Sequence, residues 1–342
     1  MSNNIKNFSV GYNPINKSNI FSSGDHISGQ ITLELTADSN IDSLSIKLKG
    51  KAEVMWTEYH YGESIKSYHG KQKFFTLKQV IIQKNQGNNI VHAGCNVYPF
   101  TFQIPLEELP SSFRGSFGSI TYTLEAVLSR SMRMNTKARA EFTLNHKQDL
   151  SSDPTLMEPQ HNTLNKTLKL FSSGVVTMDV NITRTGFRQG EGILVVASFE
   201  NKSSRPVKPK YCLNKKETYF AKRRKKVETK DIVKEAGDVI QPFGSATVTR
   251  IITIPPVSYV SVLNCSIVRV EYRLKVYLDV KYALDPEITF PIVVLQAVER
   301  VDEEQNLQLP DVPSYGYRAF SGSNPAASGP PPLPPPYGTY EP

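Results

Sequence analysis

The fold class is decided by the stretch Val270-Glu271-Tyr272-Arg273-Leu274-Lys275-Val276-Tyr277-Leu278-Asp279-Val280. Apolar side chains occupy every second position, and this period of two is typical of a strand with one face in a hydrophobic core. The same alternation occurs at Ile120-x-Tyr122-x-Leu124-x-Ala126 and at Leu44-x-Ile46-x-Leu48. Dense turn chemistry separates such segments, and no stretch holds a helical period of useful length. We therefore predict an all-β protein built of immunoglobulin-type β-sandwiches.

Two sets of signatures repeat along the chain. An Ile-Pro pair at Ile104-Pro105 precedes the strand at Ile120 by 16 residues, and Ile254-Pro255 precedes the strand at Val270 by the same interval. The pattern Phe-x-x-Gly-acid-x-Ile begins at Phe21 and again at Phe187. The Ile-Pro pairs lie 150 residues apart and the Phe-x-x-Gly patterns 166, so the first half carries about 16 extra residues between them. We interpret the repeat as an internal duplication and expect the extra residues within Glu58 to Lys73.

The duplication sets the predicted domain boundaries. A first sandwich is expected at residues 1–148 and a second at 167–299, joined by a polar, proline-bearing linker at 149–166. Residues 300–342 are poor in aliphatic side chains and rich in proline, glycine and serine, a composition that predicts a disordered tail.

Composition bounds the cell compartment and the chemistry. The chain has 342 residues and no apolar run long enough to span a membrane, nor an N-terminal basic-then-apolar signal, so we expect it in the cytosol. Its three cysteines, Cys95, Cys212 and Cys265, are odd in number and lack metal-ligand spacing. Neither a disulfide framework nor a metal site is predicted, and no cofactor is expected.

The tail ends in a candidate peptide ligand, Pro334-Pro335-Pro336-Tyr337. Consecutive prolines hold the backbone near polyproline II before a partner binds, which lowers the entropy lost on binding. Such a sequence resembles the Pro-Pro-x-Tyr ligands that the WW domains of HECT-type ubiquitin ligases bind, with Pro334, Pro335 and Tyr337 as the contacting residues. A second, degenerate candidate is Val312-Pro313-Ser314-Tyr315, in which valine replaces the first proline and only Pro313 and Tyr315 fit the pattern.

The formal net charge of +8 permits attraction to phosphate-bearing partners. The densest basic cluster is Lys222-Arg223-Arg224-Lys225-Lys226, between a predicted strand that ends near Phe220 and the segment Val227 to Val233. One interpretation is a solvated hairpin, and the alternative is a contact with anionic lipid or phosphate.

Residues that resemble catalytic or metal-binding groups lack the spacing for that chemistry. Asp25-His26 fits a turn better than half of a triad, and His60, Glu63 and His69 fit an exposed hairpin better than a metal site. Gly190-x-Gly192 lacks the third glycine of a dinucleotide loop. Aromatic residues are not interleaved with basic ones in a nucleic-acid-binding pattern. No enzymatic activity and no nucleic-acid partner are predicted.

Taken together, the signatures resemble a known family. They include Gly50-x-Ala52-x-Val54-x-Trp56, Pro99-Phe100-x-Phe102-x-Ile104-Pro105, Asn201-x-Ser203-Ser204 and Asn264-Cys265-Ser266-Ile267-x-Arg269-Val270-x-Tyr272, beside the repeated signatures above. Over roughly residues 5 to 298 the sequence resembles the arrestin fold, and within it the arrestin-domain-containing proteins, or α-arrestins. The resemblance implies two tandem arrestin-like sandwiches and a disordered proline-rich tail.

The same resemblance implies an adaptor. Its sandwiches would engage membrane receptors or transporters as cargo, while the tail recruits a WW-domain HECT-type ubiquitin ligase for ubiquitination, endocytosis and endosomal sorting. The chain would then act in the cytoplasm, with recruitment to the plasma membrane and endosomes and with peripheral membrane association. Two alternatives stay open: a retromer-type sorting subunit that works without a ligase, and a thioredoxin-binding scaffold of the same family. The scaffold requires a reactive cysteine at an accessible position.

Overall fold

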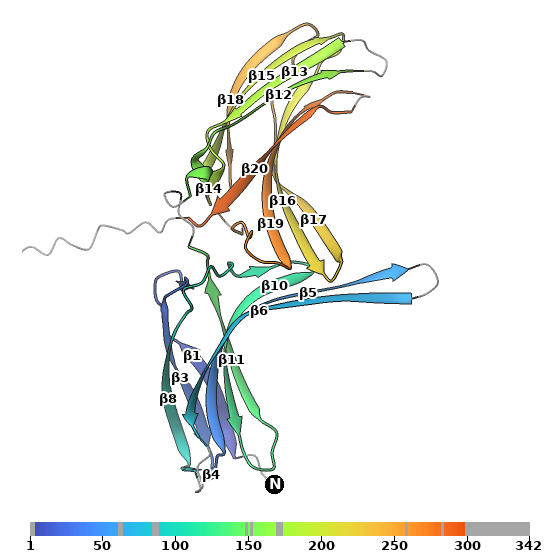
Figure 1. Ribbon diagram of the computed structural model, residues 1–342. Coiled ribbons are helices and arrows are strands. Elements are labelled where there is room, and N and C mark those ends of the chain that lie inside the picture. Colours follow the sequence, from blue (N-terminus) through green and yellow to red (C-terminus); the bar gives the residue numbers. More distant parts are fainter. Residues whose placement is uncertain are drawn as a thin grey trace, which may run out of the picture. The chain divides into compact units, whose positions relative to one another are not determined.

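The computed structural model describes residues 4–60, 64–83, 89–147, 150, 153–168, 174–256, 259–281 and 284–297 (Figure 1). The described strands all fall within one compact unit that spans residues 1–298. The only helical element in these ranges is a short 3-10 turn, η1 (Pro154–Met157). In the same ranges there is no helix of the length and hydropathy needed to cross a bilayer. The all-β prediction is confirmed.

The first sandwich consists of two principal antiparallel layers. Its smaller sheet has the order β1-β3-β8, and its larger sheet has the order β2-β11-β10-β5-β6 with β9 at the side of β10. A short pair, β4-β7, lies at one end. The strands are β1 (Ile5–Tyr12), β2 (Ile20–Phe21), β3 (His26–Leu35), β4 (Ser39–Asn40), β5 (Ser43–His60), β6 (Ser64–Ile82), β7 (Ile90–Val91), β8 (Gly94–Gln103), β9 (Phe113–Arg114), β10 (Gly118–Ser129) and β11 (Thr136–Leu144).

The second sandwich repeats the topology of the larger sheet and adds a fourth strand to the smaller one. Its sheets have the orders β12-β13-β15-β18 and β14-β20-β19-β16-β17, so each strand of the larger sheet has a counterpart at the same place in the first sandwich. The parallel pair β2–β11 corresponds to the parallel pair β14–β20. The strands are β12 (Gln160–Thr167), β13 (Gly174–Ile182), β14 (Gly186–Arg188), β15 (Gly192–Ser203), β16 (Lys208–Ala221), β17 (Arg224–Ala236), β18 (Ser245–Thr253), β19 (Val268–Asp279) and β20 (Glu287–Leu295).

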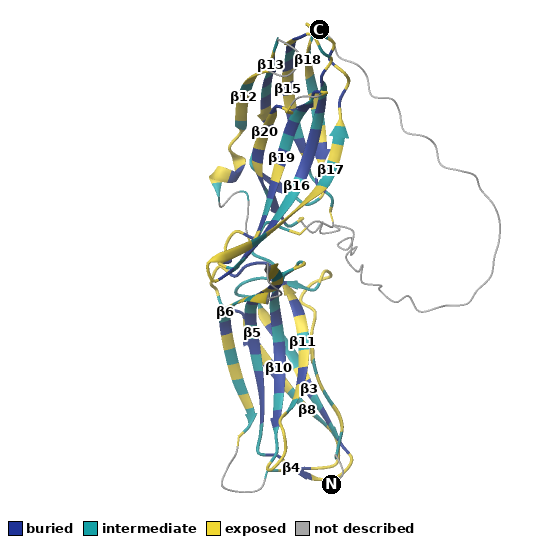
Figure 2. Cartoon of the chain, turned by 90° about the vertical axis from the view of Figure 1, so that its right-hand side faces the viewer, coloured by how far each residue is buried: buried dark blue, intermediate teal, exposed yellow. Residues whose placement is uncertain are grey.

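Each sandwich has a core built by the alternating strands from which the fold was predicted. In β10 the side chains of Ile120, Tyr122 and Leu124 are buried, and in β19 those of Val270, Tyr272 and Leu274 are buried. Figure 2 shows the resulting stripes of buried and exposed residues along the strands of both sandwiches. Burial of such apolar area is the main stabilising contribution to each sandwich.

Most of the extra sequence of the first half lies in one hairpin. Strands β5 and β6 are 18 and 19 residues long, whereas their counterparts β16 and β17 are 14 and 13 residues long. Figure 1 shows the β5–β6 hairpin running past the other strands of its sheet. The predicted insertion, Glu58 to Lys73, lies in this hairpin.

The region predicted as a linker, 149–166, contains more structure than its composition indicates. The 3-10 turn η1 has Asp153 as its N-cap, and the strand β12 pairs with β13 from Gln160 to Thr167. The segment therefore contributes an edge strand to the second sandwich. Residues 300–342, predicted as the tail, lie outside the described residues.

Candidate functional site

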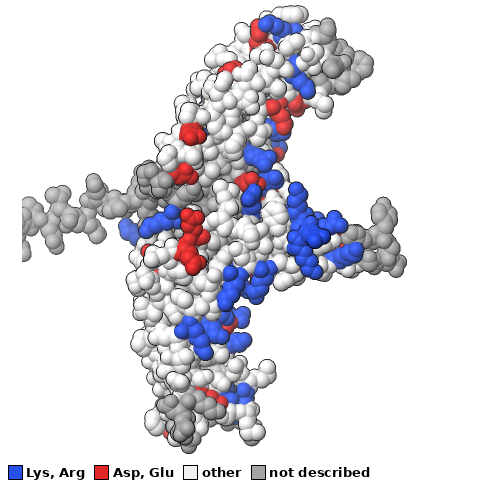
Figure 3. Space-filling view, in the orientation of Figure 1, with Lys and Arg blue, Asp and Glu red and all other residues white. Residues whose placement is uncertain are grey.

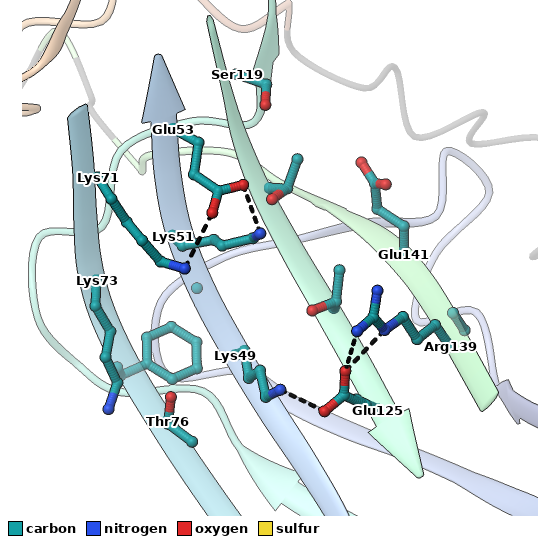
Figure 4. Close-up of a pocket in the computed structure, with 15 residues that line it drawn as sticks. Lys49, Lys51, Glu53, Lys71, Lys73, Thr76, Ser119, Glu125, Arg139 and Glu141 are labelled. Carbon is teal, nitrogen blue, oxygen red and sulfur yellow. Dashed lines mark hydrogen bonds and ion pairs between the residues drawn. The ribbon is translucent and has the colours of Figure 1, made fainter. Parts of the chain in front are cut away.

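A hollow lies on the outer face of the first sandwich, where β5, β6, β10 and β11 lie side by side (Figure 4). Alternation along these strands places apolar side chains in the core and their neighbours on this outer face, as with buried Leu48 beside Lys49 in β5. We call this surface the cationic face. It encloses about 700 Å³ and is lined by Lys49, Gly50, Lys51, Glu53, Lys71, Lys73, Phe75, Thr76, Ser119, Thr121, Thr123, Glu125, Arg139, Ala140 and Glu141.

Two carboxylates organise the cations of this face. Glu125 accepts hydrogen bonds from Lys49 Nζ at 2.5 Å and from Arg139 Nε at 2.7 Å, so it links β5, β10 and β11. Glu53 lies between Lys51 Nζ at 2.6 Å and Lys71 Nζ at 3.0 Å (Figure 4). These partners hold the lysine and arginine heads at fixed places on the face.

The electrostatics of the face follow from these contacts. Burial of the Glu125 carboxylate raises its pKa, but the hydrogen bonds from Lys49 and Arg139 outweigh burial and leave the pKa below its usual value. The hydrogen bond from Lys51 similarly lowers the pKa of Glu53. Both acids are therefore ionised at neutral pH, and each shares its charge between two cations.

Positive charge nevertheless exceeds negative charge on this face. Five cations line it against three carboxylates, and Glu141 also pairs with Arg114 Nη2 at 2.5 Å. No ion pair of Lys73 is found among the described residues. Hydroxyl groups of Thr76, Ser119, Thr121 and Thr123 also line the face. A surface of ammonium, guanidinium and hydroxyl donors is suited to an acidic or phosphorylated peptide segment.

The basic cluster at 222–226 covers the turn of the β16–β17 hairpin and the first residues of β17. Lys222 occupies the turn with φ 55°, a left-handed conformation, and residues 222 to 225 are exposed. Lys226 turns back toward the first sandwich, with Nζ 4.0 Å from Glu58 and 5.5 Å from the centre of the Phe117 ring. Figure 3 shows Lys and Arg side chains gathered at this hairpin tip and over the cationic face.

The described cysteines differ in accessibility. Cys95 is exposed on β8, whereas Cys212 and Cys265 are buried. Burial raises the pKa of Cys212 to about 11, and burial also raises the pKa of Cys265. A raised pKa leaves little thiolate at neutral pH, so neither buried thiol is activated as a nucleophile.

The residues that were considered for catalysis or metal binding have structural roles where they are described. Asp25 accepts the backbone N–H of Ser22 at 2.7 Å and closes a turn. His69 is exposed on β6 opposite Met55, while the side chains of His60 and Glu63 lie outside the description. Within the described ranges, no cluster of three metal-ligating side chains is present.

Sequence reasoning missed the cationic face and could not locate the tail residues. The available signal for the face was Lys47-x-Lys49-x-Lys51, in which lysine alternates with core residues of β5. The WW-ligand candidates Pro334, Pro335 and Tyr337, and the degenerate pair Pro313 and Tyr315, lie outside the described residues.

Comparison with known proteins gives matches over both sandwiches. The family model for the arrestin (or S-antigen) N-terminal domain matches residues 8–151, and that for the C-terminal domain matches residues 172–299. Arrestin domain-containing protein 4 of Mus musculus is 30% identical over 284 residues, which cover 80% of this chain and 68% of that protein. Arrestin domain-containing protein 4 of Homo sapiens is 28% identical over 284 residues, which cover 80% of this chain and 68% of that protein.

A second relative carries a different name. Thioredoxin-interacting protein of Rattus norvegicus is 29% identical over 304 residues, which cover 85% of this chain and 74% of that protein. The sequence signatures favour arrestin domain-containing protein 3 within the α-arrestins. The matches support the α-arrestin assignment and not that finer one.

Proposed function

This chain belongs to the arrestin family and is an α-arrestin; we propose that it is an adaptor that links membrane cargo to a WW-domain HECT-type ubiquitin ligase. Arrestin-family proteins are non-enzymatic adaptors or scaffolds. The proposed cargo is a receptor or transporter, and the proposed outcome is its ubiquitination, endocytosis and endosomal sorting. The adaptor would act in the cytoplasm and be recruited to the plasma membrane and endosomes. Neither a catalytic activity nor a nucleic-acid partner is part of the proposal.

The cargo half of the proposal is carried by the cationic face. Five cations on one sheet face, four of them held by Glu53 and Glu125, fit together with the hydroxyls of this face an extended acidic or phosphorylated segment of a cargo's cytoplasmic region. Such an attraction depends on ionic strength, because charges that stay near solvent are screened by salt. Cargo binding would therefore be transient and tunable.

The face is tested with a fluorescent peptide rich in glutamate and a phosphoserine version of it. Reversing Lys73→Glu removes a cation without breaking an ion pair among the described residues, and we expect affinity for both peptides to fall about threefold at low salt. Lys166→Glu, an exposed lysine on β12 of the second sandwich, is the matched control and should change little. If both variants lost affinity equally, the effect would come from the net charge of the chain, and the cationic face would lose its support as a specific binding site.

The ligase half is supported by the sequence of the tail. Pro334, Pro335 and Tyr337 form a complete Pro-Pro-x-Tyr ligand, whereas the candidate at Pro313 and Tyr315 lacks its first proline. One preorganised ligand in one small groove implies a dissociation constant on the order of micromolar, which corresponds to a binding free energy of about −8 kcal/mol. We propose that the upstream candidate adds only weak avidity.

Fluorescence anisotropy of a 331–342 peptide against WW domains of HECT-type ligases tests this half. We expect micromolar binding that Tyr337→Ala abolishes, because the tyrosine ring is the anchor of the motif. The full-length Tyr337→Ala chain should retain its melting temperature and lose ligase capture. Unchanged capture by this variant would exclude the motif as the recruiting site and favour the retromer-type alternative.

The hairpin tip at Lys222, Arg223, Arg224, Lys225 and Lys226 is proposed as a phosphate or anionic-lipid contact that supports peripheral membrane association. Four of these five residues are exposed, and the turn holds them on one tip. The test replaces Lys222, Arg223 and Lys225 with glutamine and measures binding to anionic vesicles. Unchanged binding would indicate a purely solvated hairpin and contradict the proposed contact.

A thioredoxin-binding scaffold is the second candidate, because some relatives are named thioredoxin-interacting proteins. The buried thiols of Cys212 and Cys265 have raised pKa values and are poor nucleophiles, which leaves Cys95 as the exposed described cysteine. If this candidate held, thioredoxin would be captured by the wild-type chain and not by Cys95→Ser.

A further inference from the structure

The turn between β10 and β11, residues 130–135, exposes two methionines almost completely. The side chains of Met132 and Met134 have relative exposures of 105% and 93%. Pairing of Ser129 with Ser43 places this 130–135 turn at the end of the first sandwich where β5 begins. Single exposed apolar residues are ordinary, but large apolar side chains gathered at one tip mark interaction sites.

The backbone of the turn is fixed in a conformation that methionine does not favour. Met132 has φ 58°, in the left-handed region where glycine or asparagine is less strained. The N–H of Arg133 donates to the carbonyl of Arg130 at 3.2 Å, and Ser131 Oγ donates to Asp42 Oδ1 at 2.7 Å. The turn is thus held so that both methionines point to solvent. Retained strain of this kind is a feature of functional positions.

Three cations lie close to the methionines in the sequence. Arg133 and Lys137 are exposed, and Arg130 is half-buried with no hydrogen-bond partner for its Nε in the described part of the chain. Burial and the charge of Arg133 lower the pKa of Arg130, so the two guanidinium groups repel each other. An anion placed beside them would relieve this repulsion.

A third apolar side chain lies at the same end. The N–H of Ile41 donates to the carbonyl of Asn89 and the N–H of Asp42 donates to that of Ser129, so these backbones flank the same short segment. Ile90, next to Asn89, is 55% exposed. The nearby acid Asp42 already accepts the Ser131 hydroxyl. The tip therefore carries exposed apolar side chains, with Arg130 and Arg133 in the turn, Lys137 on β11 and the acids Asp38 and Asp42 at the same end of the sandwich.

We propose that the 130–135 turn is a membrane-insertion tip, in which Met132 and Met134 enter the interface of an anionic bilayer and Arg130, Arg133 and Lys137 contact lipid phosphates. An exposed hairpin tip with two flexible, unbranched side chains suits the adaptable surface of a bilayer better than a preformed protein groove. The surrounding charges select anionic lipid and remain at headgroup depth while the apolar atoms insert.

The tip and the cationic face are built on the same two strands. Arg139 on β11 is five residues from Met134, about 17 Å at the usual rise of a strand. Insertion of the tip would therefore hold the cationic face close to the headgroups, where the cytoplasmic segments of membrane proteins emerge. The tip proposal does not require the adaptor function, because the tip would bind protein-free vesicles.

Vesicle flotation of the full chain tests the tip. We expect binding to phosphatidylcholine vesicles that contain phosphatidylserine, little binding to pure phosphatidylcholine, and a loss of about fivefold or more in Met132→Gly/Met134→Ser. Met157→Ser, a half-exposed methionine of the second sandwich, is the matched control and should bind as wild type. Glycine relieves the strain at position 132, so Met132→Gly alone should melt at the same temperature or higher.

A depth measurement separates the tip from the basic hairpin at 222–226. Met134→Trp should be quenched by brominated lipid, whereas wild type carries only Trp56, which is buried, and should not be quenched. Unreduced binding of Met132→Gly/Met134→Ser, or no quenching of Met134→Trp on bound vesicles, would overturn the proposal. Loss of binding only on neutralising Lys222, Arg223 and Lys225 would overturn it likewise and assign the contact to the hairpin.

Discussion

At the scale of single residues, the repeated signatures perform the same task in both sandwiches. The N–H of Gly24 donates to the carbonyl of Ile104 at 3.1 Å, and that of Gly190 donates to Ile254 at 3.0 Å. In return, the N–H of Ile104 donates to the backbone carbonyl of Asp25 at 2.8 Å, and the N–H of Ile254 donates to that of Glu191 at 2.9 Å. The two sequence patterns, far apart in the chain, are thus halves of one contact, which explains why they recur together.

The glycines of this contact are required by their backbone conformation. Gly24 and Gly190 have φ 86° and 84°, where a Cβ is strained. We expect Gly190→Ala to lower the free energy of unfolding by about 1 kcal/mol, although a Cβ there meets nothing within 4 Å. Gly11→Ala, which has equal space and no positive φ, is the control for urea denaturation and should not destabilise. Equal stability of all three proteins would contradict the role assigned to φ.

At the scale of elements, the alternation of apolar residues predicted the strands but not which strands pair with one another in a sheet. The core faces of β10 and β19 follow directly from a period of two, because each buries one face. In β6 the period fails, since Gly50 pairs with Phe75 and Lys51 with Lys73, which leaves a bulge at Phe74. The cationic face depends on this register and on β5, β6, β10 and β11 lying together. A single sequence records neither, so the face could not be predicted.

Glu125 allows the contribution of the charges on the cationic face to stability to be measured. Its side chain is only 6% exposed, and its lowered folded pKa means that ionised Glu125 stabilises the fold. We expect Glu125→Gln to lower the free energy of unfolding at pH 7 by about 1–2 kcal/mol. The difference in free energy of unfolding between Glu125→Gln and wild type has its full size above the usual glutamate pKa of 4.5. It disappears as the pH falls through the lowered pKa that Glu125 has in the folded protein.

Urea denaturation between pH 7 and pH 3 checks this dependence on Glu125. Glu107→Gln, an exposed carboxylate beyond the end of β8, is the control and should follow wild type over the whole range. A stability gap between Glu125→Gln and wild type that stays constant down to pH 3 would show that the lost packing, and not the lost charge, destabilises the variant.

At the scale of the described unit, the two sandwiches meet through loop residues and through residues of the strands β6, β9 and β16. Phe113 packs edge to face on Tyr259 with ring centres 5.2 Å apart, and Phe117 packs on Tyr219 at 5.7 Å. Asn264 Nδ2 donates to the carbonyl of Glu108 at 3.2 Å. The segment Asn264-Cys265-Ser266 indicated the family but not this role, because contacts between domains have no periodic signature in the sequence.

Gln72 of β6 is the centre of this seam, and its removal provides a test of how firmly the sandwiches are joined. Its Oε1 accepts the Ser266 hydroxyl at 2.7 Å, the Ser266 N–H at 3.0 Å and the Cys265 thiol at 3.4 Å. We expect Gln72→Ala to weaken the seam by about 1–2 kcal/mol, since three partners lose one acceptor. Hydrogen exchange should then accelerate in residues 261–267, while β19 keeps its protection because its core contacts are untouched. Gln30→Ala, on an exposed site of β3, controls for the loss of a glutamine side chain. Unchanged exchange in 261–267 would mean that the aromatic pairs and the Asn264–Glu108 hydrogen bond hold the seam without Gln72, whereas faster exchange throughout β19 would show that the seam stabilises the second sandwich itself.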